Sequence, residues 1–283
     1  MRGVSLADGR LPSSRLGFGT SSLHHLKTQR ERAALLAHCY ERGIRHFDSA
    51  PLYGHEMAER ELGRFIRGRR PDLVVATKFG IEPDPWMRRS PALMYMGLFT
   101  RALAARLGAR TGHEWVKDYS PKRMLHSLER SLTNLRTDYV DLLFAHEPTL
   151  ASPGFSEGLV RELERIRSDG KARFVGLSGN AGDCMGLALR YPGISDVLQI
   201  DVGTEPQSVK RATEAGLMPG VTFGHFRVAL KGTATRSRSP IIREQLALAV
   251  EENTRGVILF SARSLDRIDE VVRLLGQLDT VAE

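Results

Sequence analysis

Four side chains suited to proton transfer follow short apolar runs of this chain. Asp48 and Tyr53 lie at and just after the end of one run, Lys78 ends the next run, and His146 follows a third. A free phenol titrates at about pH 10, and a neighbouring ammonium lowers that pKa because it stabilises the phenolate. We therefore expect Lys78 to lower the pKa of Tyr53, so that the phenol can act as an acid near neutral pH. Asp48 would keep Lys78 charged and oriented, and His146 would donate a hydrogen bond to a substrate oxygen.

This set of side chains fits chemistry at a carbonyl group. Proton transfer onto a carbonyl oxygen accounts for only half of a reduction, because the carbon also needs a hydride and no amino-acid side chain supplies one. A nicotinamide cofactor carries that hydride, and the protein provides orientation and electrostatics. The four residues therefore predict an oxidoreductase that transfers hydride between a nicotinamide and the carbonyl of an aldehyde or ketone.

The elements that must position these residues alternate regularly along the chain. Apolar runs rich in Val, Ile, Leu and Phe predict strands buried on both faces. Amphipathic stretches between them predict helices, and together they make eight βα units, the pattern of one (β/α)8 TIM barrel in the α/β class. The predicted strands are 16–19, 44–49, 73–78, 139–145, 174–178, 197–202, 218–223 and 256–260. The predicted helices are 29–42, 56–66, 121–135, 155–168, 183–190, 206–215, 241–253 and 264–278.

A long insertion interrupts the third of these units. Residues 79–120 separate the third strand from its helix and include a short predicted helix at 98–107. In a barrel of this type the loops after the strands surround the active face, so we expect this segment to lie over it. No linker divides the chain, and residues 1–283 form one predicted domain, with a hairpin at 2–12 ahead of the first barrel strand.

Composition narrows the class of protein. The 283 residues include 41 Lys+Arg and 33 Asp+Glu, a formal net charge of +8, with 41% hydrophobic residues. The basic clusters at 67–70, 88–89 and 236–238 are short and not interleaved with aromatic residues, which argues against nucleic-acid binding. The chain contains no run of 18 apolar residues that would predict a membrane span. We also expect no secretory signal, because the first residues lack a continuous apolar stretch. With only Cys39 and Cys184, we expect a cytoplasmic protein with reduced thiols.

Two motifs resemble those of the aldo-keto reductases. They are GIRHFDSAPLYG at residues 43–54 and SLTNLRTDYVDL at 131–142, the second leading into His146; LGFGT at 16–20 also fits. The resemblance extends from there to the last helix. It implies a (β/α)8 barrel and NADP(H)-dependent carbonyl reduction, with Tyr53 as the proton donor. The DSAPLYG form is similar to that of members that oxidise sugars, so the reverse alcohol oxidation is also expected. The catalytic residues that the resemblance implies are Asp48, Tyr53, Lys78 and His146.

The resemblance also implies cofactor contacts at the strand ends. Gly179 stands where many relatives have Asn, so that Asn180 is displaced by one residue from the position that holds the carboxamide. The last helix begins near Arg263 and Arg267, four residues apart, and a helix N-terminus favours anions such as the 2′-phosphate of NADP(H). The predicted cofactor-binding residues are Asp48, Ser178, Asn180, Gln199, Phe223, Ser261, Arg263 and Arg267.

Other functions are open at this point. The leading alternative is a barrel that holds a nucleotide and senses redox state or regulates a partner, with little catalysis. A lyase that forms a Schiff base on Lys78 is disfavoured because Asp48 would raise the lysine pKa. A metal hydrolase is disfavoured because the nine histidines form no HxH or HExxH set. We expect a small-molecule carbonyl or alcohol substrate, no nucleic acid and no membrane; the substrate itself, the reaction direction, the preference between NADP and NAD, and the oligomeric state are not predicted.

Overall fold

The structure, a computed structural model, describes residues 3–107, 115–205, 207–217, 219–227, 229–231 and 238–279. Several predicted features extend outside these ranges. They are position 2 of the hairpin, 108–114 of the insertion, the first residues of one helix and one strand at 206 and 218, and 236–237 of a basic cluster.

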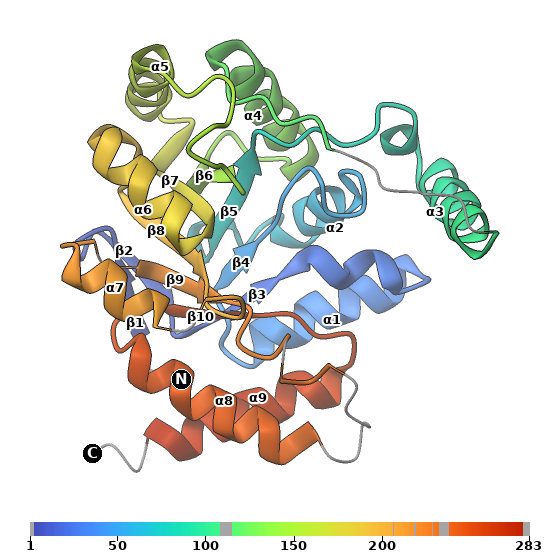
Figure 1. Cartoon of the computed structure of the whole chain (residues 1–283). Coiled ribbons are helices and arrows are strands. Elements are labelled where there is room, and N and C mark those ends of the chain that lie inside the picture. Colours follow the sequence, from blue (N-terminus) through green and yellow to red (C-terminus); the bar gives the residue numbers. More distant parts are fainter. Residues whose placement is uncertain are drawn as a thin grey trace.

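Eight parallel strands close a barrel, as the sequence predicts, in the order β10-β3-β4-β5-β6-β7-β8-β9 (Figure 1). A separate antiparallel hairpin precedes them, formed by β1 (Gly3–Leu6) and β2 (Leu11–Ser14). The barrel strands are β3 (Leu16–Gly19), β4 (His46–Asp48), β5 (Val74–Phe79), β6 (Val140–His146), β7 (Ala172–Asn180), β8 (Val197–Asp201), β9 (Pro219–Phe223) and β10 (Val257–Phe260).

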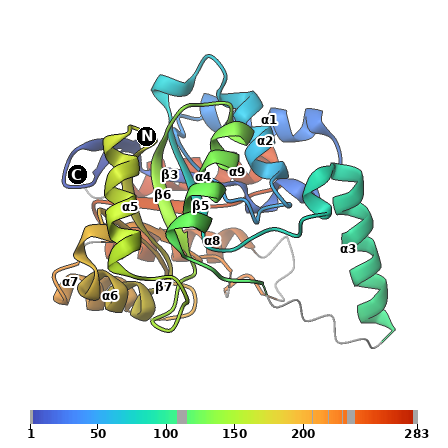
Figure 2. The same cartoon turned by 90° about the horizontal axis from the view of Figure 1, so that it is seen from above.

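Helices surround the barrel (Figures 1 and 2). The α-helices are α1 (Gln29–Glu41), α2 (Met57–Ile66), α3 (Pro91–Arg106), α4 (Pro121–Leu135), α5 (Glu157–Ser168), α6 (Ala181–Arg190), α7 (Ser208–Glu214), α8 (Arg238–Glu252) and α9 (Leu265–Asp279). Single-turn or short 3-10 helices are η1 (Thr20–His25), η2 (Arg70–Asp72), η3 (Met87–Arg89) and η4 (Pro192–Ile194).

Polar side chains begin several of these helices. Thr28 starts α1 with a capping box: its Oγ1 accepts from the Glu31 amide at 3.1 Å, and the Glu31 carboxylate accepts from the Thr28 amide at 2.8 Å. Asn180 caps α6 by accepting from the Asp183 amide at 3.1 Å. Helix α6 therefore begins at Ala181, two residues before its predicted start.

The apolar core has two layers, one on each side of the barrel wall. Inside the barrel, strand residues such as Val74, Leu142 and Val257 pack together, and Leu6 and Leu11 of the hairpin join them. The hairpin thus closes the end of the barrel at which the strands begin. Burying these side chains contributes roughly 1.5–3 kcal/mol each before the loss of conformational entropy is counted.

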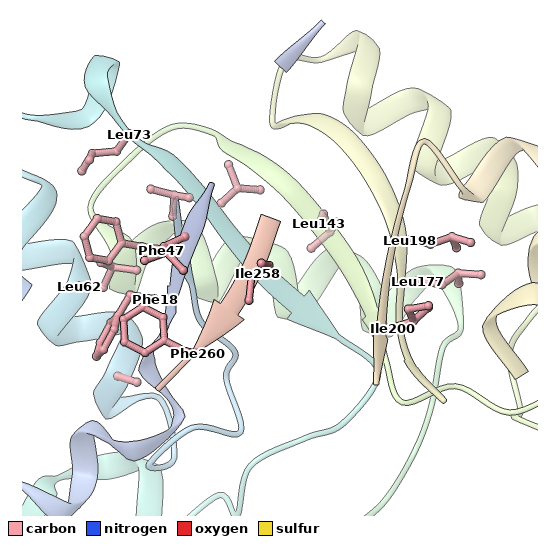
Figure 3. Close-up of a cluster of buried hydrophobic side chains, with 14 of the residues drawn as sticks. Phe18, Phe47, Leu62, Leu73, Leu143, Leu177, Leu198, Ile200, Ile258 and Phe260 are labelled. Atoms are coloured by element: carbon pink, nitrogen blue, oxygen red, sulfur yellow. The ribbon is translucent and has the colours of Figure 1, made fainter. Parts of the chain in front are cut away.

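The larger layer lies between the strands and the helices. Figure 3 shows Phe18, Phe47 and Phe260 gathered beside Leu62 of α2. Phe18 meets the other two rings edge-on, with centroids 6.5 Å from Phe47 and 5.9 Å from Phe260. Each of these strands therefore buries one face against the barrel interior and the other against a helix, which explains its almost unbroken apolar sequence.

The insertion after β5 contains a longer helix than predicted. Helix α3 begins at Pro91 rather than at residue 98, and it extends away from the barrel in both views (Figures 1 and 2). Its base is held by Met94, which packs with Met57 and Met87, and by Tyr95, whose hydroxyl donates to the carbonyl of His24 at 3.0 Å. Farther along, Met96, Phe99, Leu103 and Leu107 are exposed.

Both cysteines, Cys39 and Cys184, are buried and carry free thiols. Burial raises the pKa of each thiol, so neither is a reactive thiolate at neutral pH. Within the described part of the chain, every helix is too short or too polar to span a bilayer.

Candidate active site

Most of the predicted site residues face the interior side of the barrel wall. On β5, Val74 and Ala76 belong to the interior cluster, whereas Val75 packs against the helices. Side chains alternate along a strand, so Lys78 is the next interior residue. The same alternation puts the following residues on the interior side, near the ends of their strands or just beyond: Asp48 (β4), Lys78 (β5), His146 (β6), Ser178 (β7), Gln199 (β8), Phe223 (β9) and Ser261 (after β10).

Asp48 and Lys78 form a buried ion pair, as predicted. The Lys78 ammonium donates to both carboxylate oxygens of Asp48 at 2.6 Å and to the carbonyl of Ser49 at 3.0 Å. Each side chain is only 1% exposed. Gln199 Nε2 adds a hydrogen bond to Asp48 Oδ1 at 3.1 Å. Burial lowers the pKa of Lys78 and Asp48 opposes that shift, because removing either charge would leave the other unpaired in the interior.

Tyr53 reaches the same end of the barrel from the turn after β4. Its amide donates to the carbonyl of Ala50 at 3.0 Å, and the next residues, Gly54 and His55, turn the chain with φ values of 57° and 49°. The Lys78 Nζ lies 4.9 Å from the centroid of the phenol ring. The His146 ring meets the phenol ring edge-on, with 5.8 Å between centroids. The four predicted catalytic residues are therefore neighbours.

The predicted pKa shift of Tyr53 has the wrong direction. Burial raises the pKa of Tyr53 well above its ordinary value, and the carboxylates of Asp48 and Glu147 raise it further. The Lys78 ammonium does not outweigh these effects, because it is hydrogen-bonded to Asp48 and lies over the ring face. The phenol is consequently protonated throughout the neutral range. That is the form a proton donor requires.

His146 is held by residues of the insertion. Tyr119, fully buried, donates its hydroxyl to the backbone carbonyl of His146 at 2.6 Å. Burial lowers the pKa of His146 well below its ordinary value, and the charges of Lys78 and Lys117 lower it further. The imidazole is therefore neutral at physiological pH. One of its ring nitrogens carries a proton and can donate a hydrogen bond.

A cleft of about 670 Å³ opens beside these side chains. The cleft is suited to a small molecule, because concave pockets with a few convergent polar groups are the usual binding sites of small ligands. The predicted site residues that line it are Asp48, Tyr53, His146, Ser178, Gln199, Phe223 and Ser261. Lys78 lies directly behind it, bonded to Asp48.

Three predicted cofactor residues do not line this cleft. Asn180 caps α6, and its amide nitrogen donates to Glu205, so the geometry gives no support to the predicted contact with the carboxamide. Arg267 lies in the first turn of α9, where its guanidinium pairs with Glu270. Arg263 precedes that helix, close enough to His24 and His25 to lower their pKa values.

The cleft has the features that a nicotinamide would need. Gln199 Oε1 is buried without a hydrogen-bond partner among the described residues, although it lies beside the cleft. A buried acceptor left unpaired is costly, and the carboxamide of a nicotinamide offers an N–H donor. Phe223 presents an aromatic ring in the same cleft. These residues fit the group.

Two kinds of lining residue were not predicted as site residues. Glu147 follows His146 directly, where the sequence suggests only a turn. Arg227 and Lys231, from the segment between β9 and α8, and Arg238, the first residue of α8, also line the cleft. The sequence contains a signal for this part of the site, because these three cations lie within twelve residues of one another (227–238) and follow a barrel strand.

The described part of the insertion does not cover the cleft, contrary to expectation. None of its described residues is among the lining, and α3 extends away from the barrel (Figure 2). Its final stretch nevertheless supports the site from outside. The Trp115 ring packs against the His55 ring in a tilted arrangement, with 5.8 Å between ring centroids, and Tyr119 donates a hydrogen bond to the carbonyl of His146. Among the described residues there is also no cluster of three His, Cys, Asp or Glu side chains that could hold a metal ion.

Solved structures share this architecture. An aldo-keto reductase from Bacillus halodurans in its holo form aligns with a TM-score of 0.73 at 20% identity, covering 97% of this chain and 91% of that chain. An aldo-keto reductase from Klebsiella pneumoniae in complex with NADPH aligns with a TM-score of 0.68 at 18% identity, covering 99% and 95%. At these identities the likeness concerns the fold.

Curated relatives are similar in sequence. L-galactose dehydrogenase of Arabidopsis thaliana is 26% identical over 203 residues, 69% of this chain and 54% of its own. D-threo-aldose 1-dehydrogenase of a Pseudomonas species is 29% identical over 182 residues, 62% of this chain and 53% of its own. The chain thus spans about half the length of these relatives. The model of the Aldo/keto reductase family matches residues 15–217, most of the 283 residues. Together with the closed barrel and the grouping of Asp48, Tyr53, Lys78 and His146 at its rim, this match shows that the chain belongs to the aldo/keto reductase family.

Proposed function

We propose that this protein transfers hydride between NADP(H) and the carbonyl of an aldehyde or ketone, with Tyr53 as the proton donor. The observation that carries the proposal is the grouping of a protonated phenol and a neutral imidazole on one cleft, next to the buried Asp48–Lys78 pair. A substrate carbonyl in this cleft would meet two hydrogen-bond donors. Such donors stabilise the negative charge that develops on the oxygen during reduction.

Each residue has a role in this reaction. Tyr53 would donate its proton to the carbonyl oxygen, and His146 would orient that oxygen through a hydrogen bond. Lys78, fixed by Asp48, would stabilise the phenolate that remains. Gln199 and Ser178 would hold the carboxamide of the nicotinamide, and Phe223 would stack on its ring. When bound, the nicotinamide supplies the hydride.

The protonation state of Tyr53 favours the reductive direction. Because the pKa of the phenol lies well above its ordinary value, the acid form predominates at neutral pH. Alcohol oxidation needs the phenolate as a base, a minor species under the same conditions. The reverse reaction, for example the oxidation of a sugar-like alcohol, would therefore be favoured only at high pH.

Positive charge along the cleft supports a phosphorylated cofactor. Arg227, Lys231 and Arg238 line the cleft and would bind the pyrophosphate of a dinucleotide, Arg227 while it is paired with Asp201. Arg263 and Arg267 at the start of α9 would meet the adenosine 2′-phosphate. This second assignment requires Arg267 to exchange its contact with Glu270 for the phosphate.

The names of the relatives favour a sugar-like substrate. Two of them are named as dehydrogenases of L-galactose and of D-threo-aldoses. We include hydroxylated aldehydes and their cyclic forms in the proposed substrate class on this ground.

The proposal is tested by assaying purified protein with NADPH and a panel of aldehydes and ketones, and in the reverse direction with NADP⁺ and sugars. We expect carbonyl-dependent loss of NADPH absorbance, faster with NADPH than with NADH. Absence of any change with every carbonyl and every alcohol, in a sample that binds NADPH, would instead favour the nucleotide-holding regulatory barrel.

A further inference from the structure

Glu147 has an unusual backbone conformation for its position. It is the first residue after β6, directly follows His146, and has a φ of +47°. Side chains with a Cβ rarely adopt this left-handed region, and such strain persists only where the surrounding structure enforces it. Strained residues of this kind concentrate at functional sites, and Glu147 lines the catalytic cleft.

Two neighbours enforce the backbone of Glu147. Its amide donates to the carbonyl of Ser178 at 2.6 Å, and its carbonyl accepts from Lys117 Nζ at 2.8 Å. The carboxylate is much less constrained: its Oε2 lies 4.0 Å from the Lys117 ammonium, and the side chain is 63% exposed. The main chain is therefore fixed while the charged group remains accessible to a ligand.

The adjacent strand makes room for this arrangement. A Cβ added to Gly179 would lie 3.0 Å from Glu147 Cα, tighter than an ordinary van der Waals contact. A larger residue at 179 would push the Glu147 backbone away from Ser178. The glycine on β7 and the strained glutamate after β6 are thus matched to each other.

The distribution of charge in the cleft gives Glu147 a distinct role. Among the described lining residues, the other carboxylate is Asp48, which is buried and paired with Lys78. The lining cations Arg227, Lys231 and Arg238 come from beyond β9, three strands around the barrel from β6. An exposed carboxylate therefore lies beside His146, loosely paired with Lys117, whereas the cations that line the cleft come from the β9 side.

We infer that Glu147 is a specificity-determining residue that selects carbonyl substrates bearing hydroxyl, amide or ammonium groups and rejects those bearing a carboxylate or phosphate. Its carboxylate accepts hydrogen bonds from such donors and repels a substrate anion. The Glu147 carboxylate also raises the pKa of both Tyr53 and Lys78, although burial is the larger influence on each. The inference rests on the proposed carbonyl reduction and adds a substrate class to it.

Two aldehydes of the same shape but different charge test the inference. Steady-state kcat/KM with NADPH is measured for 4-formylbenzoate, an anion, and 4-formylbenzamide, a neutral hydrogen-bond donor, with wild type and Glu147→Gln. We expect the substitution to raise kcat/KM for the benzoate and to lower it for the benzamide, so that their ratio changes by about tenfold. The control is Glu41→Gln, which removes the same charge from the exposed end of α1, and its ratio should equal that of wild type.

A purely structural role for Glu147 would change both substrates equally. An unchanged ratio in Glu147→Gln, whatever the absolute rates, would therefore overturn the inference. Binding of benzoate and benzamide, followed by ligand-observed NMR, separates this outcome from failure of the proposed function. If wild type reduces no aldehyde, the proposed function fails, and selection among carbonyl substrates fails with it. Tighter binding of benzoate relative to benzamide in Glu147→Gln would still show that Glu147 excludes anions from the cleft, and unchanged relative binding would overturn that as well.

Discussion

At the scale of single residues, the Asp48–Lys78 pair determines how Tyr53 can act. The ammonium gives both of its short hydrogen bonds to Asp48 and approaches the phenol only at its face. The acidity of the phenol is consequently set by burial and by the nearby carboxylates, which favour the neutral form. Lys78 then offsets part of the cost of the phenolate that forms as the proton leaves, without bringing the pKa of the phenol near neutral pH.

The two reaction directions should therefore depend differently on pH. Reduction uses the protonated phenol, whose pKa is raised well above its ordinary value, so Tyr53 should cause no fall in kcat/KM between pH 6 and pH 9. Oxidation uses the phenolate, so its log kcat/KM should rise by about one per pH unit over that range. Initial rates in both directions across these pH values check this. A reduction rate that falls with an apparent pKa near 7 would show that Lys78 lowers the phenol pKa after all.

At the scale of elements, helix contacts set the distance between neighbouring units of the barrel. Gly63 lies where α2 crosses α4, and a Cβ there would come within 2.7 Å of Leu135 Cα. A Cβ added to Gly276, in the last turns of α9, would have no neighbouring atom within 4 Å apart from the backbone of its own helix. The two glycines are both helical and differ in their surroundings.

Alanine at these positions should have opposite effects on the free energy of unfolding. Gly63→Ala should cost roughly 1–3 kcal/mol, because the α4 backbone has to move. Gly276→Ala should stabilise by about 0.5–1 kcal/mol, because alanine loses less backbone entropy in a helix. Urea denaturation of both variants measures this. Equal changes in the two variants would contradict the close crossing of α2 and α4.

The two basic segments near the cofactor cleft should also behave differently. Lys231 lines the cleft, so Lys231→Ala should weaken NADPH and NADH alike, by about fivefold to tenfold. Arg267 lies at the start of α9, so Arg267→Ala should weaken NADPH by a similar factor and leave NADH nearly unchanged. Dissociation constants from the quenching of intrinsic fluorescence distinguish the two. Equal losses for both cofactors in Arg267→Ala would remove it from the 2′-phosphate site.

Much of the barrel could be predicted from the sequence, because its strands are apolar on both faces and end in the residues that carry the chemistry. Helix α3 was predicted too short. The helix continues through Gly97 towards its start at Pro91, and the side chains of Met87 and Trp86 pack against that glycine. The role of Asn180 as a helix cap is a local contact with the Asp183 amide, which the expected match to the family motif obscured. The direction of the Tyr53 pKa shift depends on burial and on carboxylates of other segments. Periodicity and motif spacing do not contain that information.

At the scale of the whole molecule, buried histidines link stability to pH. Burial holds the pKa of His225 at about 4 and that of His46 at about 3, and lowers that of His146 well below its ordinary value. In the unfolded chain these side chains take up protons at about pH 6.5. Below that pH the unfolded state binds more protons than the folded state, so folding becomes less favourable.

Stability should thus be complete above about pH 6.5 and fall as the solution is acidified towards pH 4. Each histidine can contribute a slope of roughly 1.4 kcal/mol per pH unit, partly offset by Glu59, whose raised pKa acts in the opposite sense. Denaturant unfolding of wild type and His46→Gln at pH 7, 6 and 5 measures how the free energy of unfolding changes with pH. In the variant this slope should be smaller, by the amount that corresponds to about one proton. Identical slopes would show that His46 is not held neutral.

The most direct test of the account is the rate of NADPH oxidation by an aldehyde in Tyr53→Phe, measured in a single turnover beside wild type. The substitution removes one hydroxyl from the cleft and leaves the Asp48–Lys78 pair and the residues proposed to hold the nicotinamide in place. We expect the rate constant to fall by about 100-fold to 10,000-fold, while the Kd for NADPH changes less than twofold. A rate constant equal to that of wild type would mean that the proton comes from another group, and the proposed mechanism would be wrong.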